Sequence, residues 1–483
     1  MGEIKKNFIF SSILTVSNYI FPFIIFPYIS RILGVENIGI CNFVDSIINY
    51  FMLFSMMGIG VVGVREIAAA KSNRMELRRV FTSLFFLTLI STTIALFVLV
   101  FAVSYVESLE PYRCLLYIGT IKIFGNFLIL DWLYRGLEDF KYITYRTIAV
   151  KICYLISVFC FVNTESDYYI YYTLLCLMVA LNSIFSCFRA KDLLLLKFKE
   201  LRLKEYITPL FTLGIYGFLT SLYTTFNVVY LGVSSGDVEV GYYATATKFF
   251  GVIIAIYTAF TTVMLPRMSA LSSKDKKQEF IQLANKSVDL LVLVTIPILM
   301  FIFVFSREII ELFAGEGYQG AILPLRIVII LIFVIGYEQI LIIQMLTPLK
   351  KDKAILLNSI LGAVVGIALN ILLVSRYGSI GSSFVWVFSE IAVLISAQYF
   401  IFKYVNFKFP YKLVIRNLIY YIPFGVLCYI LQENEEVHSY VILLLGGCLM
   451  VAYAFLVQNL FLKNEIFISQ KNRIKERIKK GLV

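Results

Sequence analysis

Residues 22–65, PFIIFPYISRILGVENIGICNFVDSIINYFMLFSMMGIGVVGVR, decide the fold of this chain. An apolar run ends at Arg31, a short polar turn follows, and a second apolar run carries Asp45 in its interior and ends at Arg65. Because an apolar run of about 20 residues crosses a bilayer, this stretch predicts two membrane helices joined by a tight turn, with one acid kept inside the membrane.

The same pattern returns in the middle of the chain. The tripeptide Leu-Gly-Val occurs at 33–35 and again at 231–233, and Gly39 and Gly241 lie at the same distance from the arginine that ends each run. The second run also carries an early charge, Lys248. These matches indicate an internal repeat, which is typical of membrane transporters.

The composition excludes a soluble protein of this size. The chain has 483 residues, of which 60% are hydrophobic and only 15% are charged. Fourteen apolar runs are long enough to cross a bilayer. They are Phe8–Ser30, Ile38–Val62, Val80–Ser104, Cys114–Tyr134, Thr147–Val162, Tyr169–Cys187, Ile207–Val233, Tyr242–Leu265, Ser287–Phe305, Ile327–Leu346, Ala354–Val374, Gly381–Phe402, Leu413–Leu431 and Tyr440–Leu462.

The distribution of Lys and Arg orients these spans. With the N-terminus inside, nearly all of the 43 basic residues fall in inner loops and flanks. We therefore expect both termini in the cytoplasm. The net charge of +12 then reflects topology and contact with anionic membrane lipids, and nucleic-acid binding is not expected.

The predicted fold class is an all-α integral membrane protein built from two six-helix repeats. Because six spans is an even number, both six-helix repeats enter from the same side and are parallel. The expected divisions are an N-lobe at 1–187, a cytoplasmic amphipathic linker at 188–206, a C-lobe at 207–402, two extra spans at 403–462 and a basic cytoplasmic tail at 463–483.

Neither a metal site nor a cofactor is expected. The eight cysteines lie in or beside spans without a CxxC pair, and His438 is the one histidine. Small buried hydrophobic side chains are the favoured interpretation of the cysteines.

Two segments resemble a known family. Residues 31–39 (RILGVENIG) and 370–390 (NILLVSRYGSIGSSFVWVFSE), together with the double six-span repeat, are similar to the polysaccharide transporter family. Its members are flippases of lipid-linked O-antigen and exopolysaccharide repeat units, within the multidrug/oligosaccharidyl-lipid/polysaccharide exporter superfamily. The resemblance implies two six-helix lobes around a central cleft lined by spans one, two, seven and eight, in the inner membrane of a bacterium. It leaves the branch open, since members with twelve and with fourteen spans exist.

Ionisable residues inside spans are candidate functional residues, because each costs about 3 kcal/mol or more at the bilayer centre unless it is paired or hydrated. They are Asp45, Lys122, Asp131, Lys151, Lys248, Asp289, Glu338 and Glu390. Snorkelling explains Asp289. For Asp131 and Lys151, near the inner ends of adjacent spans, a structural salt bridge is weighed at least equally with a site.

A flippase for lipid-linked sugars needs cations for the diphosphate. The candidates are Arg65 and Arg267 at the inner mouth of the cleft, Lys122 deeper in it, and Arg31. Plain positive-inside anchoring explains Arg65 and Arg267 about equally well.

Ion coupling is assigned to Glu338 and Glu390, since a buried carboxyl can carry a proton. Asn370 matches an asparagine that binds sodium in some members of the resembled family. The acid that those members place one turn later is Val374 here, which favours H⁺ over Na⁺ and Glu390 as its carrier.

Asp45 and Lys248 are predicted to form a gate. They follow Gly39 and Gly241 by six and seven residues, so they share a depth on helices that face each other across the cleft. The alternative is that each charge pairs within its own lobe.

Two other functions compete with a flippase. A multidrug exporter of the same superfamily should have bare acids in its lumen, and the lysines in spans disfavour it. A membrane enzyme is disfavoured because the largest outer loop, Ser306–Leu325, has neither an Asp-x-Asp nor a His. The expected partners are a polyprenyl-diphosphate-linked oligosaccharide, membrane lipids, the coupling ion and, as a candidate, a glycan polymerase.

Overall fold

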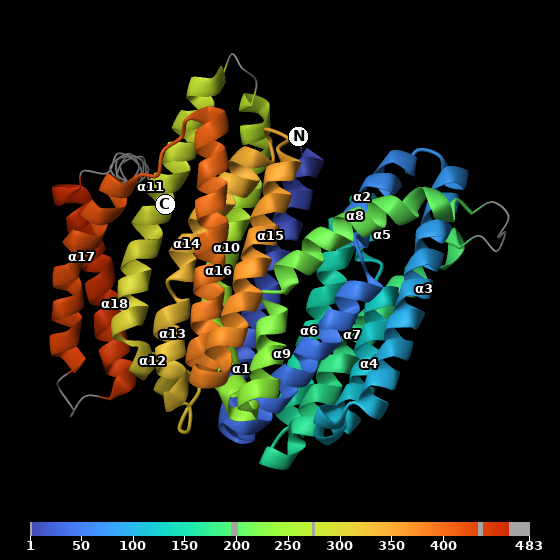
Figure 1. The fold of residues 1–483 in the computed structure, drawn as a ribbon, viewed down its shortest axis with the longest axis horizontal. Coiled ribbons are helices and arrows are strands. Elements are labelled where there is room, and N and C mark those ends of the chain that lie inside the picture. Colours follow the sequence, from blue (N-terminus) through green and yellow to red (C-terminus); the bar gives the residue numbers. More distant parts are fainter. Residues whose placement is uncertain (1, 195–200, 273–275, 433–437, 463–483) are drawn as a thin grey trace, which may run out of the picture. The chain divides into compact units, whose positions relative to one another are not determined.

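The computed structural model describes residues 2–194, 201–272, 276–432 and 438–462, and these ranges consist of helices joined by short turns and loops, without strands (Figure 1). The all-α fold class is therefore confirmed. The α-helices are α1 Gly2–Ser55, α2 Ile59–Ala70, α3 Arg74–Tyr105, α4 Arg113–Leu128, α5 Asp131–Gly136, α6 Phe140–Phe161, α7 Tyr168–Ala190, α8 Leu203–Ser221, α9 Thr225–Ser235, α10 Asp237–Leu271, α11 Lys277–Val304, α12 Ser306–Phe313, α13 Ile322–Val328, α14 Leu331–Gln339, α15 Asp352–Leu369, α16 Ser375–Val405, α17 Tyr411–Gln432 and α18 Ser439–Leu456.

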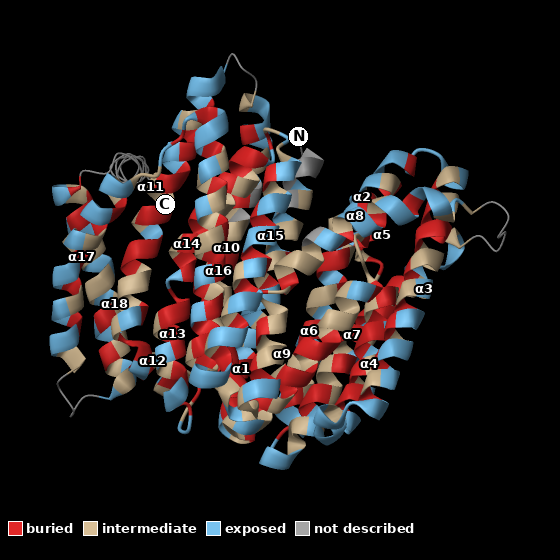
Figure 2. Ribbon diagram, in the orientation of Figure 1, coloured by how far each residue is buried: buried red, intermediate tan, exposed pale blue. Residues whose placement is uncertain are grey.

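The helices show the burial pattern of a membrane protein (Figure 2). On α3 the large apolar side chains Ile90, Ile94, Phe97 and Phe101 are exposed along one face, whereas Thr92 on the same helix is buried. In hydrocarbon an exposed apolar face is favourable, and a buried threonine can satisfy its hydroxyl by donating to a carbonyl of its own helix. Thr92 donates to Thr88 in this way, at 2.6 Å.

Ten helical stretches in the described residues are long and apolar enough to cross a membrane. Two of them, Ile9–Ala70 and Asp352–Val405, are long enough to contain two crossings each. The count of fourteen spans stays a prediction.

The chain divides into two compact units. Unit 1 comprises Met1–Ala244 and Gly362–Trp386, and unit 2 comprises Thr245–Leu361 and Val387–Val483. Helices α10, α15 and α16 each contribute residues to both units. The predicted lobe boundaries stay a prediction, and the tail at 463–483 and part of the linker at 188–206 lie outside the described residues.

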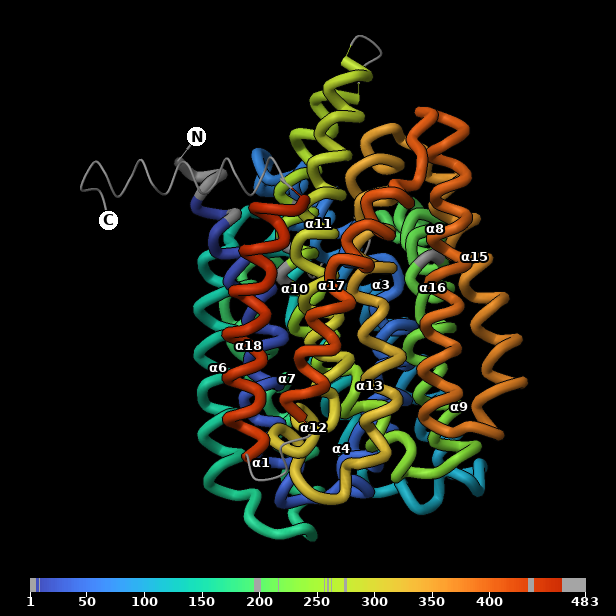
Figure 3. Tube along the Cα trace, turned by 90° about the vertical axis from the view of Figure 1, so that its left-hand side faces the viewer, coloured from blue at the N-terminus to red at the C-terminus, as the bar shows by residue number. Residues whose placement is uncertain are grey.

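Within unit 2, the last two helices pack beside each other. Figure 3 shows α17 and α18 running side by side, and the Tyr453 hydroxyl of α18 donates to the Tyr420 carbonyl of α17 at 2.8 Å. Buried Asn417 of α17 accepts from Gln458 at 3.2 Å. Such polar contacts between helices are favourable where no water competes for them.

The turn predicted after Arg31 is a kink at a single residue inside α1. Gly34 has φ 72° and ψ 171°, a conformation open to glycine because it has no Cβ. Gly236, between α9 and α10, has nearly the same angles, φ 88° and ψ 175°. The repeat therefore aligns Gly34 with Gly236. The predicted match of 33–35 with 231–233 was wrong, because Gly232 lies within helix α9 and a shared tripeptide does not encode backbone conformation.

Candidate functional site

Asp45 and Lys122 form an ion pair within unit 1. Asp45 lies on α1 and Lys122 on α4, and Lys122 Nζ is 2.5 Å from Asp45 Oδ1. Asn49, one turn after Asp45, donates to Asp45 Oδ2 at 3.0 Å and accepts from Lys122 at 3.0 Å. The three side chains form a closed cycle in which each charged group has two partners, so the lysine charge is neutralised inside its own unit.

The predicted gate between Asp45 and Lys248 stays a prediction. Lys248 belongs to unit 2 and Asp45 to unit 1. The partner that the structure gives Asp45 is the lysine of α4, as the alternative of pairing within one lobe would require.

The kinked ends of the two repeats meet inside unit 1. A Cβ on Gly39 would overlap the carbonyl oxygen of Asp237, and a Cβ on Gly241 would overlap the carbonyl oxygen of Val35. Val35 and Asp237 directly follow the two kink glycines. A contact in which two equivalent residues exchange partners in this way is the signature of a two-fold axis.

A side-chain hydrogen bond lies next to this crossing of the two repeats. The Tyr112 hydroxyl donates to the Asp237 carboxylate, at 2.8 Å from Oδ2 and 2.9 Å from Oδ1. On the other side of the α10 start, Glu239 accepts from the backbone N–H of Ser379 at 2.6 Å. The two acids in the first turn of α10 therefore bind it to Tyr112 on one side and to Ser379 on the other.

Glu338 and Glu390 lie together in unit 2. They come from α14 and α16, and their carboxyl groups share a hydrogen bond. Only 6% of Glu390 is exposed, and Glu338 Oε2 is buried without a hydrogen-bond partner. A hydrogen bond between two carboxyl groups requires a proton on one of them, so this pair can hold and release a proton.

Asn370, the third residue predicted for ion coupling, belongs to unit 1. It is fully buried at the start of a π-helical turn, Asn370–Val374, and its Nδ2 donates to the Gly366 carbonyl at 2.9 Å while its Oδ1 has no partner. Among the described residues, no group of three His, Cys, Asp or Glu could hold a metal ion.

The structure gives two of the predicted arginines local contacts. Arg65 is exposed and pairs with the adjacent Glu66 at 2.8 Å, in the wall of a 350 Å³ pocket that Glu76 and Arg202 also line. Arg267 is exposed on α10 of unit 2, and Arg31 donates to the Pro27 carbonyl at 2.9 Å. Their roles in binding substrate stay predictions.

The predicted salt bridge between Asp131 and Lys151 is wrong. Asp131 pairs instead with Arg146, whose Nη2 is 2.6 Å from Asp131 Oδ1. The reason is a break at Leu130, which has φ 53°, so that Asp131 begins the separate short helix α5 at the end of α6 where Arg146 lies. Lys151 is further along α6, beyond the reach of this acid.

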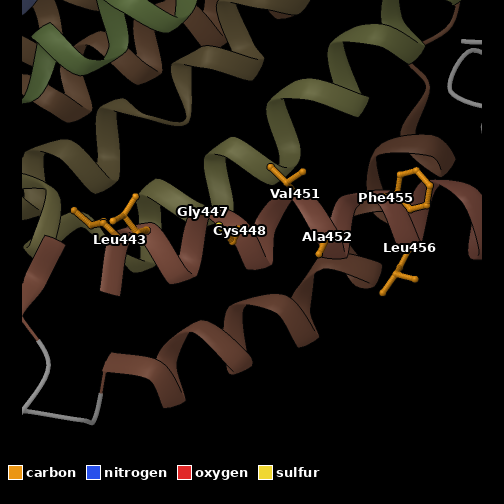
Figure 4. Close-up of a pocket in the computed structure, with 8 residues that line it drawn as sticks. Leu443, Gly447, Cys448, Val451, Ala452, Phe455 and Leu456 are labelled. Atoms are coloured by element: carbon orange, nitrogen blue, oxygen red, sulfur yellow. The ribbon is translucent and has the colours of Figure 1, made fainter. Parts of the chain in front are cut away.

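An apolar groove runs along α18 (Figure 4). Its volume is about 800 Å³, and Leu443, Gly447, Val451 and Phe455 line it on successive turns. Because these side chains are apolar, the groove offers no hydrogen bond to a sugar or a phosphate. We assign it to the lipid-facing surface.

Sequence reasoning missed several polar partners. Asn49 and Tyr112 complete the two polar contacts of unit 1, and Gln344 is fully buried in a π-helical turn with neither amide atom bonded. The available signal was an amide inside an apolar run.

Comparisons with known proteins agree with this architecture. The family model described as "Polysaccharide biosynthesis protein" matches residues 4–272, more than half of the chain, and the MatE model matches residues 213–372. Two relatives carry the name "Putative O-antigen transporter". The one from Escherichia coli (strain K12) is 25% identical over 73% of this chain and 85% of its own length. The one from Shigella dysenteriae is 25% identical over 81% of this chain and 98% of its own length.

A solved structure has a similar fold. It is the lipid II flippase MurJ in an inward closed conformation, with a TM-score of 0.66 over 90% of this chain and 98% of that chain. Its sequence is 15% identical to this one, so the likeness concerns the fold.

Proposed function

Because this chain belongs to the polysaccharide biosynthesis protein family, we propose that it is a flippase for a polyprenyl-diphosphate-linked oligosaccharide. The cargo is an O-antigen or exopolysaccharide repeat unit, and it moves from the cytoplasmic to the outer leaflet of a bacterial inner membrane. The names of the two relatives support the class of cargo. The chain acts as a transporter and catalyses no covalent step.

The main support for the transport mechanism is the reciprocal contact of Gly39 with Asp237 and of Gly241 with Val35. It joins equivalent ends of the two repeats across a two-fold axis, and alternating access requires equivalent ends that close and separate in turn. With both termini in the cytoplasm, these ends lie on the outer side, and the cargo enters from the inside while they are joined.

Coupling to an ion belongs to the Glu338 and Glu390 pair. The contact between the two buried carboxyl groups supports this assignment, because a proton on one of them relieves their repulsion and burial makes its release costly unless the surroundings change. A conformational change that exposes the pair to water would therefore release the proton, and protonation would accompany the return. Proton flow would in this way drive the cycle.

A multidrug exporter is the second candidate, and the match of the MatE model to residues 213–372 favours it. Its cargo is cationic, so it needs acids without cationic partners. In unit 1 Asp45 is neutralised by Lys122, which disfavours a cation site there.

Reconstituted vesicles test the proposal. Purified protein should accelerate the transfer of a fluorescent polyprenyl-diphosphate oligosaccharide between leaflets, and cationic dyes should not compete with it. The matched genetic test is restoration of surface glycan in a host that lacks its own flippase. Dye transport without glycan transfer would overturn the proposal in favour of the exporter.

A further inference from the structure

Lys151 is a buried lysine whose contacts are all with uncharged groups. It lies on α6, where 7% of the residue is exposed, and its Nζ donates to Asn18 Oδ1 at 2.6 Å and to Ser17 Oγ at 3.2 Å. The Phe21 ring is the third neighbour, with its centroid 5.7 Å from Nζ. No carboxylate of the described residues forms an ion pair with this lysine.

The position is deep in the helix bundle. Lys151 is eleven residues from the start of α6 at Phe140. It therefore lies at the middle of the 22-residue stretch Phe140–Phe161, which is long and apolar enough to cross a membrane. An ammonium at that depth is costly without a counter-charge, and two neutral oxygens compensate only part of the cost.

The packing of α1 against α6 holds this lysine in place. Before it, the Thr144 hydroxyl donates to the Phe10 carbonyl at 3.0 Å. After it, the Tyr28 hydroxyl donates to the Val162 carbonyl at 2.9 Å. Since both residue numbers rise together, the helices run parallel, and they are tied on each side of Lys151. The ammonium is thus pre-organised rather than free to swing away.

Lys122, another buried cation of unit 1, already has a carboxylate partner. Lys122 is bound by Asp45 and Asn49, whereas Lys151 has an amide and a hydroxyl where Lys122 has a carboxylate. Asn18 is also exposed, although it lies well inside the first span, between its start at Ile9 and the kink at Gly34. An exposed amide at this depth avoids a desolvation cost only if it faces water or a polar solute.

We propose that Lys151 and Asn18 form an anion-binding point in unit 1 that holds a phosphate group of the cargo during transport. The proposal rests on the proposed function and specifies which residues take the diphosphate. The ammonium donates to a phosphate oxygen, and the Asn18 amide adds a second donor from Nδ2 while its oxygen keeps the lysine oriented. The phosphate then supplies the counter-charge that the protein does not provide.

Binding of farnesyl diphosphate to the purified full-length protein tests this proposal. Lys151→Gln keeps a hydrogen-bonding side chain and removes the charge, so we expect the Kd to rise about tenfold or more, as for loss of a charge-assisted hydrogen bond. Lys151→Arg should keep most of the affinity. Lys141→Gln is the matched control, since it removes a lysine from the exposed start of the same helix. It should bind like the wild type.

Three further ligands identify the source of the phosphate. Inorganic pyrophosphate that competes equally well would mean recognition of the anion alone, and phosphatidylglycerol that competes equally well would mean a lipid headgroup site; either result would overturn the assignment to cargo. Farnesol should not compete. Unchanged affinity in a folded Lys151→Gln protein would also overturn it.

Failure of the anion-binding point can be distinguished from failure of the proposed flippase function. If the wild type restores surface glycan and the Gln variant binds normally, only the anion-binding point fails. If Gln disrupts folding, Asn18→Ala is the second test. It removes an exposed side chain, and we expect the Kd to rise in a protein that remains folded. An unchanged Kd would overturn the proposal.

Discussion

At the scale of single residues, the role of each buried ionisable group in this membrane protein depends on the groups that contact it. Asp45 and Lys122 neutralise each other, Glu338 and Glu390 lie against each other, and Lys151 donates to neutral oxygens. The sequence places all five in apolar runs without distinguishing these three states. Each state predicts a different response to substitution.

The Asp45–Lys122 pair predicts that the losses in free energy of unfolding caused by the two single substitutions will not add up in the double variant. Lys122→Met leaves a partly buried carboxylate without its cation, and we expect a loss of about 3 kcal/mol in the free energy of unfolding, toward the low end for a broken buried pair because Asp45 keeps 24% of its side chain exposed. The double variant Asp45→Asn with Lys122→Met should recover most of this stability, because it leaves no unpaired charge. Thermal unfolding in detergent measures both. A double variant as unstable as the sum of the two single variants would contradict the pairing.

The proposed role of Glu338 and Glu390 in proton coupling predicts a stalled transport cycle in Glu390→Gln. An amide preserves the hydrogen bond to Glu338 but cannot release a proton, so transport driven by a pH gradient should fall to background while cargo binding remains. Glu279→Gln, at an exposed site on α11 of the same unit, is the control. Full dependence on the pH gradient in the Glu390 variant would remove this pair from the coupling mechanism.

At the scale of helices, the kinks at Gly34 and Gly236 set the alignment of the two repeats. They turn the chain so that the helix starts cross at Gly39 and Gly241, where backbone meets backbone. The absence of a side chain at these two crossing points is what permits the contact.

This crossing predicts opposite effects of one methyl group. Gly39→Ala should lower the melting temperature and reduce transport, because its Cβ would overlap the Asp237 carbonyl. Gly60→Ala, in α2, has open space around its Cβ, and we expect it to raise stability by about 0.5–1 kcal/mol through the helix propensity of alanine. Thermal unfolding and surface glycan display report the two effects. Equal behaviour of the two variants would argue against a close crossing.

At the scale of the whole molecule, the open question is topology. The charge distribution predicts cytoplasmic termini, and even six-span repeats then place Gly315 outside and Lys276 inside. Reporter fusions after these residues should be active in the periplasm and in the cytoplasm, respectively. A reversed signal at either position would exclude the fourteen-span arrangement.

The sequence by itself determined the membrane class, the helical fold, the repeat and the family resemblance. These properties follow from hydrophobicity over long runs and from glycine and charge patterns, which are local along the chain. It also located most of the buried charges, because an ionisable residue inside an apolar run is visible without knowing its neighbours.

Only the tertiary structure decided which groups meet. Asp131 pairs with Arg146 instead of Lys151, Glu338 lies against Glu390, and Gly236 rather than Gly232 is the counterpart of Gly34. The physical reason is that an ion pair or a kink depends on distances of a few ångströms and on single backbone angles. Those are set by the packing of helices far apart in the chain, and no pattern in the sequence fixes them.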